Sequence, residues 1–258
     1  MVIFPVTIQK SSDPAATTTI EADKWYTCVW TYDKSTQKMK MYTNGVLEND
    51  HSQTQSGVNG ASGMNWYLAH VPGSWQSQTY SDVSIKSFKV YDKVLSDSEV
   101  KQNYYNGSIV TDELKLNLDV SNLVSFETGS TTWYDMVNSN YSASLVGNVG
   151  YSTTYNGTLN VDGSQTSDYI ILPHQVLDND ISSNGAWSLE CWLRMDNTSG
   201  TTYFFSTATT STTNGWIIQK ANATVFPWNE SLQNGSAISF TASIVTGKHS
   251  RRYSRTIL

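Results

Sequence analysis

Strict alternation of apolar and polar residues is the feature that most constrains the fold of this chain. It recurs in three stretches, residues 114–120, 188–195 and 238–244. Because successive side chains of a β-strand point to opposite faces, each stretch is predicted to be a strand with one buried and one solvated face. Half-buried strands of this kind are typical of antiparallel sheets. The predicted inward residues are Leu114, Leu116, Leu118, Val120, Leu189, Cys191, Leu193, Met195, Ile238, Phe240, Ala242 and Ile244.

Two shorter motifs predict a hairpin and a helix. In Lys38–Thr43 two methionines alternate with two lysines, and Asn44-Gly45 then supplies the residue types that a tight hairpin turn requires. Ser96–Glu99 is a capping box, in which the serine and glutamate side chains each bond the backbone amide of the other residue. The helix that begins there is predicted to end at Asn106-Gly107.

Composition limits the class of protein. The chain has 258 residues, enough for one large β-sandwich or two small domains. Hydrophobic residues make up 38% and aromatic residues 12%, which is too rich for a disordered chain. A formal net charge of -6 argues against nucleic-acid binding, which needs a basic surface. No apolar run of about eighteen residues is present, so no membrane insertion is expected, and Met1–Pro5 does not have the pattern of a signal peptide.

Two stretches of the chain resemble a known family, the concanavalin A-like or laminin G-like jelly roll. The first has the order of a strand, a hairpin, a closing strand and a short helix, and is similar to the C-terminal half of such a domain. Its motifs are Lys24–Asp33, Met41–Val46 and Phe88–Val100. The second is similar to the N-terminal half of another copy. Its motifs are Leu114–Asp119, Thr131–Asp135, Val161–Gly163, Asp168–Ile170 and Trp187–Leu193. The resemblance implies an all-β, antiparallel β-sandwich.

The order of these stretches predicts a permuted domain. Residues 1–110 correspond to the second half of one copy and residues 111–247 to the first half of the next. Because the first and last strands of these sandwiches lie close together, we predict that residues 1–110 and 111–258 pack into one permuted jelly roll. The alternative is two incomplete half-sandwiches, each with an exposed sheet face. Residues 248–258 are unusually basic, and are either a basic tail or, as we favour, a departure of the reading frame near Gly247.

The residues that catalysis requires do not form a recognisable pattern, so the chain is predicted not to be an enzyme. A glycosidase on this fold needs two carboxylates about 5 to 9 Å apart, but Glu190 stands alone and is interpreted as a solvated strand residue. The histidines have no zinc-binding spacing, and no nucleophile elbow is present. Cys28 and Cys191 both fall on strand patterns, where the favoured interpretation is a pair of reduced core thiols.

Calcium is the one cofactor that the resemblance suggests, because relatives of this fold often carry it. Asp135, Asp162 and Asp168 fall in loops where the family pattern also has acidic residues. However, Lys86-Ser87 stands where many relatives have an Asp-Glu pair, and Asn138–Ser142 replaces a glycine-rich loop. Turn-forming aspartates are therefore the favoured interpretation, with calcium binding as the alternative.

Carbohydrate binding requires exposed aromatic rings with polar groups beside them. The best sequence candidate is the loop from His70 to Tyr80, in which Trp75 follows Pro-Gly among polar neighbours. Trp228, in Phe226–Glu230, is a second candidate. For both tryptophans the alternative is packing against the rim of the sandwich.

These observations favour a non-catalytic carbohydrate-binding or adhesion module of a larger extracellular or virion-surface protein. Its expected partner is a glycan or cell-surface polysaccharide, and tandem copies would strengthen weak binding through effective concentration. The alternative is a structural virion or surface protein that binds neighbouring domains or virion proteins. A glycoside hydrolase is the least favoured reading, since the paired acids are missing.

Overall fold

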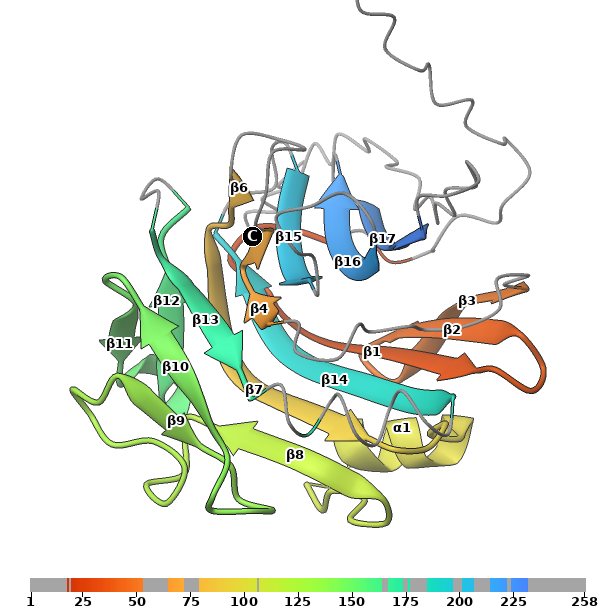
Figure 1. Cartoon of the computed structure of the whole chain (residues 1–258), viewed down its shortest axis with the longest axis horizontal. Helices are drawn as coiled ribbons and strands as arrows, with labels where there is room; N and C mark the ends of the chain where they lie inside the picture. The colour runs from red at the N-terminus through yellow and green to blue at the C-terminus, as the bar shows by residue number, and fades with distance from the viewer. Residues whose placement is uncertain are drawn as a thin grey trace, which may run out of the picture.

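The computed structural model describes residues 18, 20–52, 65–71, 79–105, 107–163, 167–173, 176, 185–196, 201–206, 214–221 and 224–231. Strands dominate these residues (Figure 1). The elements of residues 1–110 are β1 (Trp25–Asp33), β2 (Lys38–Thr43), β3 (Val46–Ser52), β4 (Trp66–Leu68), β5 (His70–Val71), β6 (Thr79–Tyr80), β7 (Val83–Tyr91) and α1 (Asp97–Tyr105). Those of the later residues are β8 (Leu114–Asp119), β9 (Thr132–Tyr134), β10 (Ser142–Val146), β11 (Gly150–Ser152), the 3-10 turn η1 (Thr154–Asn156), β12 (Thr158–Val161), β13 (Tyr169–Leu172), β14 (Ala186–Met195), β15 (Thr201–Ser206), β16 (Asn214–Ala221) and β17 (Thr224–Ser231).

Two large antiparallel sheets form the two layers of the fold. The first, sheet A, has the order β11-β12-β7-β14-β1-β2-β3, with β8 also paired to β7. The second, sheet B, has the order β17-β16-β15-β4-β13-β10-β9. One face of each sheet packs into a shared core of apolar side chains, among them Trp30, Trp133 and Phe205. The predicted all-β, antiparallel β-sandwich is therefore confirmed.

Both large sheets contain strands from both predicted segments. In sheet A, β14 lies between β1 and β7 and pairs with both along most of its length. In sheet B, β4 lies between β13 and β15. Neither large sheet is built from one segment alone, and the main core takes side chains from both segments. Within the described residues the two segments thus share one sandwich.

The local predictions hold where the structure describes them. Met39 and Met41 enter the core, and Asn44 and Gly45 both adopt positive φ, at 51° and 77°, in the β2–β3 turn. Leu189, Cys191, Leu193 and Met195 all face the core from β14. The predicted strand at 238–244 and the basic residues 248–258 lie outside the described residues.

Leu114 is the exception to the predicted alternation in β8. The residues Leu116, Leu118 and Val120 lie in the main core, but Leu114 packs against a separate small cluster that contains Tyr91. The cause is a break in the register of β7 and β8, where Val90 pairs with Leu116 but Tyr91 pairs with Leu114. A bulge of this kind changes which face of the sheet the following side chains occupy.

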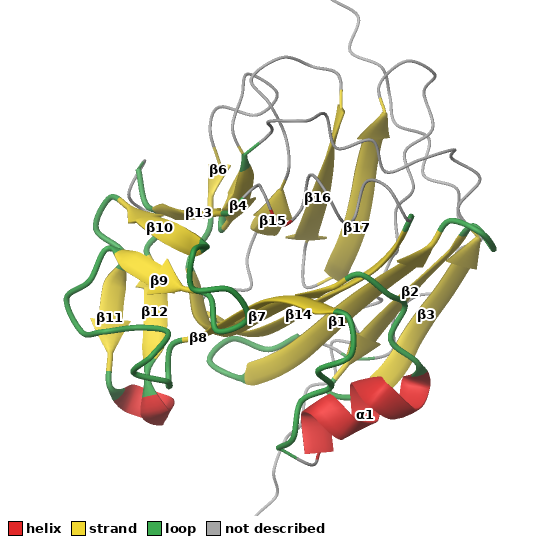
Figure 2. Ribbon diagram, turned by 60° about the horizontal axis from the view of Figure 1, so that its bottom comes forward, coloured by secondary structure: helices red, strands yellow, loops and turns green. Residues whose placement is uncertain are grey.

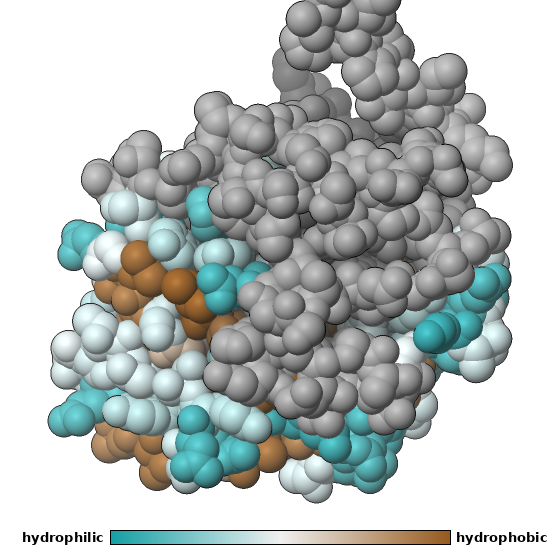
Figure 3. All heavy atoms as spheres, viewed as in Figure 1, coloured by the Kyte–Doolittle hydropathy of each residue, from teal (hydrophilic) through white to brown (hydrophobic). Residues whose placement is uncertain are grey.

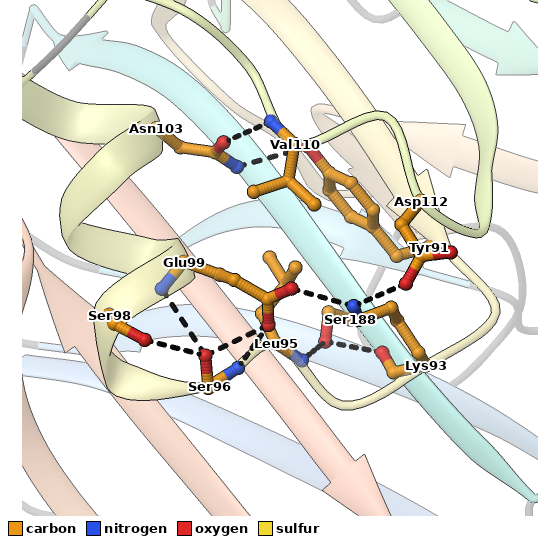
Figure 4. Close-up of polar contacts among 10 residues, drawn as sticks. All are labelled: Tyr91, Lys93, Leu95, Ser96, Ser98, Glu99, Asn103, Val110, Asp112 and Ser188. Atoms are coloured by element: carbon orange, nitrogen blue, oxygen red, sulfur yellow. Dashed lines mark hydrogen bonds and ion pairs between the residues drawn. The ribbon is translucent and has the colours of Figure 1, made fainter.

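Helix α1 lies on the face of sheet A that is turned away from β15, β16 and β17 (Figure 2). The capping box forms as predicted, since the Ser96 amide donates to Glu99 at 2.9 Å and the Glu99 amide donates to Ser96 Oγ at 3.3 Å. Asn103 fixes the other end of the helix, and its Oδ1 accepts the amide of Val110 at 2.8 Å (Figure 4). No helix within the described ranges is long and apolar enough to span a membrane.

Candidate functional site

A row of four side chains crosses sheet A on the face opposite the core. Asn160 in β12 pairs with Ser84 in β7, Ser84 pairs with Arg194 in β14, and Arg194 pairs with Trp25 in β1. The flanking residues in these strands belong to the core, so the row faces outward. Ser84 Oγ links the row, because it donates to Asn160 Oδ1 at 2.9 Å and accepts from Arg194 Nη2 at 3.2 Å.

The turn between β11 and β12 holds an aromatic ring over this row. Tyr155 adopts φ 59° and ψ 30°, the left-handed region that a bulky residue rarely occupies, and Asn156 follows at φ 66°. Gly157, at φ 104°, completes the turn close to the backbone carbonyl of Val120. Tyr155 remains 52% exposed, while its ring meets Trp25 edge to face at 5.6 Å between centroids. A conformation of this type often marks a functional position.

A small polar pocket of about 90 Å³ lies between the turn and the row. Hydroxyls, an amide and a guanidinium line it, from Ser152, Thr154, Tyr155, Thr158, Asn160 and Arg194. We call it the Arg194 pocket. The guanidinium carbon of Arg194 lies 5.9 Å from the ring centroids of both Trp25 and Tyr155. The pocket therefore combines the Tyr155 ring, a cation and neutral hydrogen-bonding groups, with the Trp25 ring beside it.

Carboxylates balance the charge of Arg194. Asp196 Oδ1 lies 2.6 Å from Arg194 Nη2, and Asp23 Oδ1 lies 4.0 Å from Nη1. Burial raises the pKa of the nearby Asp82, the charges of Asp196 and Asp162 add to this rise, and Arg194 opposes it. The site thus has several acidic groups and one cation, which suits a neutral, hydroxyl-rich ligand better than a strongly anionic one.

A second aromatic–cation pair lies on the same outward face of β14. Trp192 is two residues before Arg194, and Lys86 Nζ lies 5.4 Å from the centroid of its indole ring. The outward face between α1 and η1 therefore presents the partly exposed rings of Trp25, Tyr155 and Trp192. This face is amphipathic, as a sugar-binding surface must be.

The structure describes only part of the predicted sugar-binding loop. His70 is buried, its ring stacks on Tyr169 at 4.7 Å between centroids, and its carbonyl accepts a hydrogen bond from Ser206 Oγ. This packing suits a supporting role for His70 rather than direct contact with a ligand. Tyr80 pairs with His70 across β5 and β6. Trp75 lies outside the described residues, and of Trp228 only its backbone position in β17 is described. Sugar binding by Trp75 or Trp228 stays a prediction.

The three predicted calcium ligands do not form one centre. Asp135 is buried, and its carboxylate accepts three backbone amides, from Asn117, Val137 and Asn138, at 2.8 to 3.0 Å. Burial raises the pKa of Asp135, while these hydrogen bonds oppose the rise. Asp168 accepts the amide of Asn148 at 2.9 Å through Oδ1. Across the described ranges, no three His, Cys, Asp or Glu residues gather into a metal-binding group. The Asp135 carboxylate thus has a structural role in holding these backbone amides, and calcium binding at Asp135, Asp162 or Asp168 stays a prediction.

Glu190 was interpreted from the sequence as a solvated strand residue, and this was wrong. Its side chain is 1% exposed, because α1 covers this part of β14. Lys89 Nζ lies 2.7 Å from Oε1, and Asn103 donates to Oε2 at 2.6 Å. Oε1 thus pairs with β7 within sheet A, while Oε2 holds α1 to the sheet through Asn103.

The Arg194 pocket was missed in the sequence because its lining residues are spread over three strands and one turn. The one available signal was Tyr155-Asn156-Gly157, in which Asn-Gly predicts a turn and so an aromatic residue in a loop. Arg194 carried no such signal, because only the pairing of β14 with β1 and β7 brings it beside Trp25 and Ser84.

Exposed apolar side chains also gather near β9. Leu123 is 82% exposed and Val124 78%, and Tyr134, in β9, is joined to the same loop by the hydrogen bond from its amide to the Ser125 carbonyl. Figure 3 shows hydrophobic residues reaching the surface along the lower edge of the molecule in that view. An apolar surface of this kind can serve in contacts between proteins.

Comparison with known families agrees with the fold. Residues 6–101 match the family model described as the concanavalin A-like lectin/glucanases superfamily, which confirms the resemblance for this segment. The protein thus contains a laminin G-like region of the kind found in lectin-like and adhesion-type modules. The searches of curated proteins and of solved structures gave no significant match. The resemblance of residues 111–247 stays a prediction.

Proposed function

We propose that this protein is a non-catalytic carbohydrate-binding or adhesion module that forms part of a larger extracellular or virion-surface protein. The Arg194 pocket is the observation on which the proposal rests. Tyr155 and Trp25 offer apolar ring surface to the C–H face of a sugar. Ser152, Thr154 and Asn160 offer hydrogen-bonding groups to its hydroxyls.

The size of the pocket indicates how a sugar would bind. Pockets that enclose a drug-sized ligand measure about 300 to 1,000 Å³, whereas the Arg194 pocket measures about 90 Å³. It therefore fits one substituent of a sugar, while the ring lies over Tyr155 at the surface. Binding of this type is weak at a single site, and we infer that several copies on one particle or surface supply the overall affinity.

The burial of Glu190 supports a non-catalytic role for the protein. A glycosidase acid must reach the glycosidic oxygen, but Glu190 is buried between Lys89 and Asn103. The recognition of a surface polysaccharide, without its cleavage, is the function that these residues support best.

A glycan array tests this function directly. We expect the full chain to bind a subset of neutral glycans and Tyr155→Ala to bind them at least about tenfold more weakly, since the loss of about 1.5 kcal/mol of apolar burial has that effect. Tyr105→Ala is the matched control, because Tyr105 is 66% exposed at the end of α1, far from the pocket in sequence and on another element. Trp75→Ala tests the sequence-predicted loop in the same assay. No binding by the native chain, or equal binding by Tyr155→Ala, would count against the proposal.

The alternative function is that of a structural virion or surface protein, and the exposed residues Leu123 and Val124 favour it. In that case Leu123→Ser with Val124→Ser would abolish assembly with neighbouring proteins and leave glycan binding intact. Association of the chain with a partner protein that is unaffected by these substitutions would reject this surface as the contact.

A further inference from the structure

The two cysteines of the chain face each other across the join between its two segments. Cys28 in β1 is directly opposite Cys191 in β14 in the antiparallel register. Both side chains enter the main core, and both are free thiols that are almost completely buried. Cys28 belongs to residues 1–110 and Cys191 to residues 111–247, so a bond between them would join the two segments covalently.

Opposite residues of an antiparallel ladder form either a hydrogen-bonded or a non-hydrogen-bonded pair, and the backbone hydrogen bonds of β1 show that Cys28 and Cys191 form a hydrogen-bonded one. The amide of Lys34 donates to the carbonyl of Gly185 at 2.8 Å, whereas the carbonyl of Thr27 accepts from Asn44 in the hairpin of β2 and β3. Backbone groups alternate in direction along a strand, so the even-numbered residues of β1, including Cys28, hydrogen-bond to β14. At such a pair the Cα atoms lie about 5.5 Å apart, within the range of about 4.4 to 6.8 Å found in disulfides.

Formation of a disulfide between Cys28 and Cys191 requires a small local movement of β1 and β14. Directly opposite Cβ atoms lie about 4.5 to 5.5 Å apart, with the longer values at hydrogen-bonded pairs, while a disulfide brings them to about 3.5 to 4.5 Å. The two strands must therefore approach by about 1 Å at this position. The disulfide is then expected to be strained, and strained disulfides are the more readily reduced ones.

We propose that Cys28 and Cys191 form an intramolecular cross-strand disulfide when the chain folds in the presence of a small disulfide oxidant such as oxidised glutathione. One thiol loses its proton, and the thiolate attacks the oxidant, which releases one reduced thiol and leaves a mixed disulfide. The second thiolate then attacks the protein sulfur of that mixed disulfide and releases the other reduced thiol. The protein loses two protons and two electrons, and the oxidant takes up both.

Burial decides when this reaction occurs. The thiolate is the reactive form, and burial raises the pKa of Cys28 to about 12 and the pKa of Cys191 well above its usual value. In the folded protein neither thiol is therefore ionised or accessible at neutral pH. The redox state of the pair is set while the chain folds, and the folded core then preserves it.

The experiment is to refold the full chain from denaturant with oxidised and reduced glutathione, and in parallel with a dithiol reductant. After oxidative refolding we expect a monomer two hydrogens lighter, with no thiol that can be alkylated in denaturant and with a linked peptide pair containing Cys28 and Cys191. Its near-ultraviolet circular dichroism should match that of the reduced protein. The reduced folded protein should resist alkylation until it is denatured. Cys28→Ala, treated in the same way, should keep one alkylatable thiol.

Two results would overturn the proposal. One is the recovery of two alkylatable thiols from natively folded protein after oxidative refolding. The other is a disulfide that occurs only between chains, or only in a species whose near-ultraviolet spectrum is lost. The test needs no ligand, so it stands or fails independently of glycan binding.

Discussion

Lys89 Nζ lies 2.7 Å from Glu190 Oε1 across the paired strands β7 and β14, where both side chains are buried and Asn103 of α1 donates to Glu190 Oε2. Removal of one member of a buried ion pair leaves the other charge uncompensated, which destabilises a protein by about 3 to 5 kcal/mol. We expect Glu190→Gln to lower the free energy of unfolding by this amount in urea denaturation. Lys89→Met combined with Glu190→Gln should recover much of the loss, because Gln can still accept the hydrogen bond from Asn103.

The surface pair Lys38–Asp50 provides the control. Its nitrogen and oxygen lie 2.9 Å apart, but its side chains are 43% and 37% exposed. Exposed ion pairs contribute at most about 1 kcal/mol, so Asp50→Asn should change the free energy of unfolding very little. A Glu190→Gln effect no larger than that of Asp50→Asn would contradict the role of the buried pair.

Substitution of Gly157 tests whether the conformation of the turn that holds Tyr155 is needed for stability and glycan binding. A Cβ at Gly157 would lie 2.9 Å from the Val120 carbonyl oxygen, and the residue has φ 104°. Gly157→Ala should therefore lower the free energy of unfolding and weaken glycan binding, although residue 157 does not line the pocket. Gly107→Ala is the control, because Gly107 also has positive φ but no atom within 4 Å of the added Cβ. It should lose only about 1 to 2 kcal/mol, from the left-handed conformation alone, and it should bind glycans normally.

Ionisation of two aspartates, Asp82 and Asp33, is expected to change the stability of the folded state in opposite directions. Burial and the charge of Asp196 raise the pKa of Asp82, so ionised Asp82 destabilises the folded state and its unfavourable effect grows as pH rises through the raised pKa. Hydrogen bonds from Ser35 and Thr36 lower the pKa of Asp33, so ionised Asp33 stabilises the folded state and this gain is lost as pH falls through the lowered pKa.

Thermal unfolding of the matched variants measures this difference. At pH 7, Asp82→Asn should raise Tm and Asp33→Asn should lower it. The Asp82 difference should shrink toward zero as pH falls from the raised pKa to the usual value of 3.8, whereas the Asp33 difference should shrink only below 3.8, as pH falls through the lowered pKa. Shifts of the same sign in both variants at pH 7 would contradict these environments.

Calcium binding can be decided by the same measurement. A ligand that binds only the folded state raises Tm, by an amount that grows with the logarithm of its concentration relative to its Kd. If Asp168 binds calcium, the alternative that the sequence left open, addition of calcium should raise Tm and Asp168→Asn should abolish the rise. Asp135→Asn should destabilise the protein to the same extent with and without calcium, because its carboxylate holds three backbone amides. An unchanged Tm on addition of calcium to the native chain would reject the prediction.

Sequence reasoning succeeded where the causes are local. The capping box at Ser96 and Glu99 and the positive-φ turn at Asn44-Gly45 depend on residues a few positions apart, and both formed as predicted. It failed where the cause lies far along the chain. The partner of Glu190 is 101 positions away, and the bulge that turns Leu114 to the other face depends on the register with β7. The Arg194 pocket is of the second kind, since pairing between distant strands assembles it.

The indole N–H signal of Trp25 offers the most direct test of glycan recognition at the Arg194 pocket. The signal can be assigned by NMR with Trp25→Phe and followed while a glycan selected on the array is added. We expect this signal to shift in a saturable way, and the shift to be lost in Tyr155→Ala but kept in Tyr105→Ala. A bound glycan that leaves the Trp25 signal unmoved would contradict the assignment of this site.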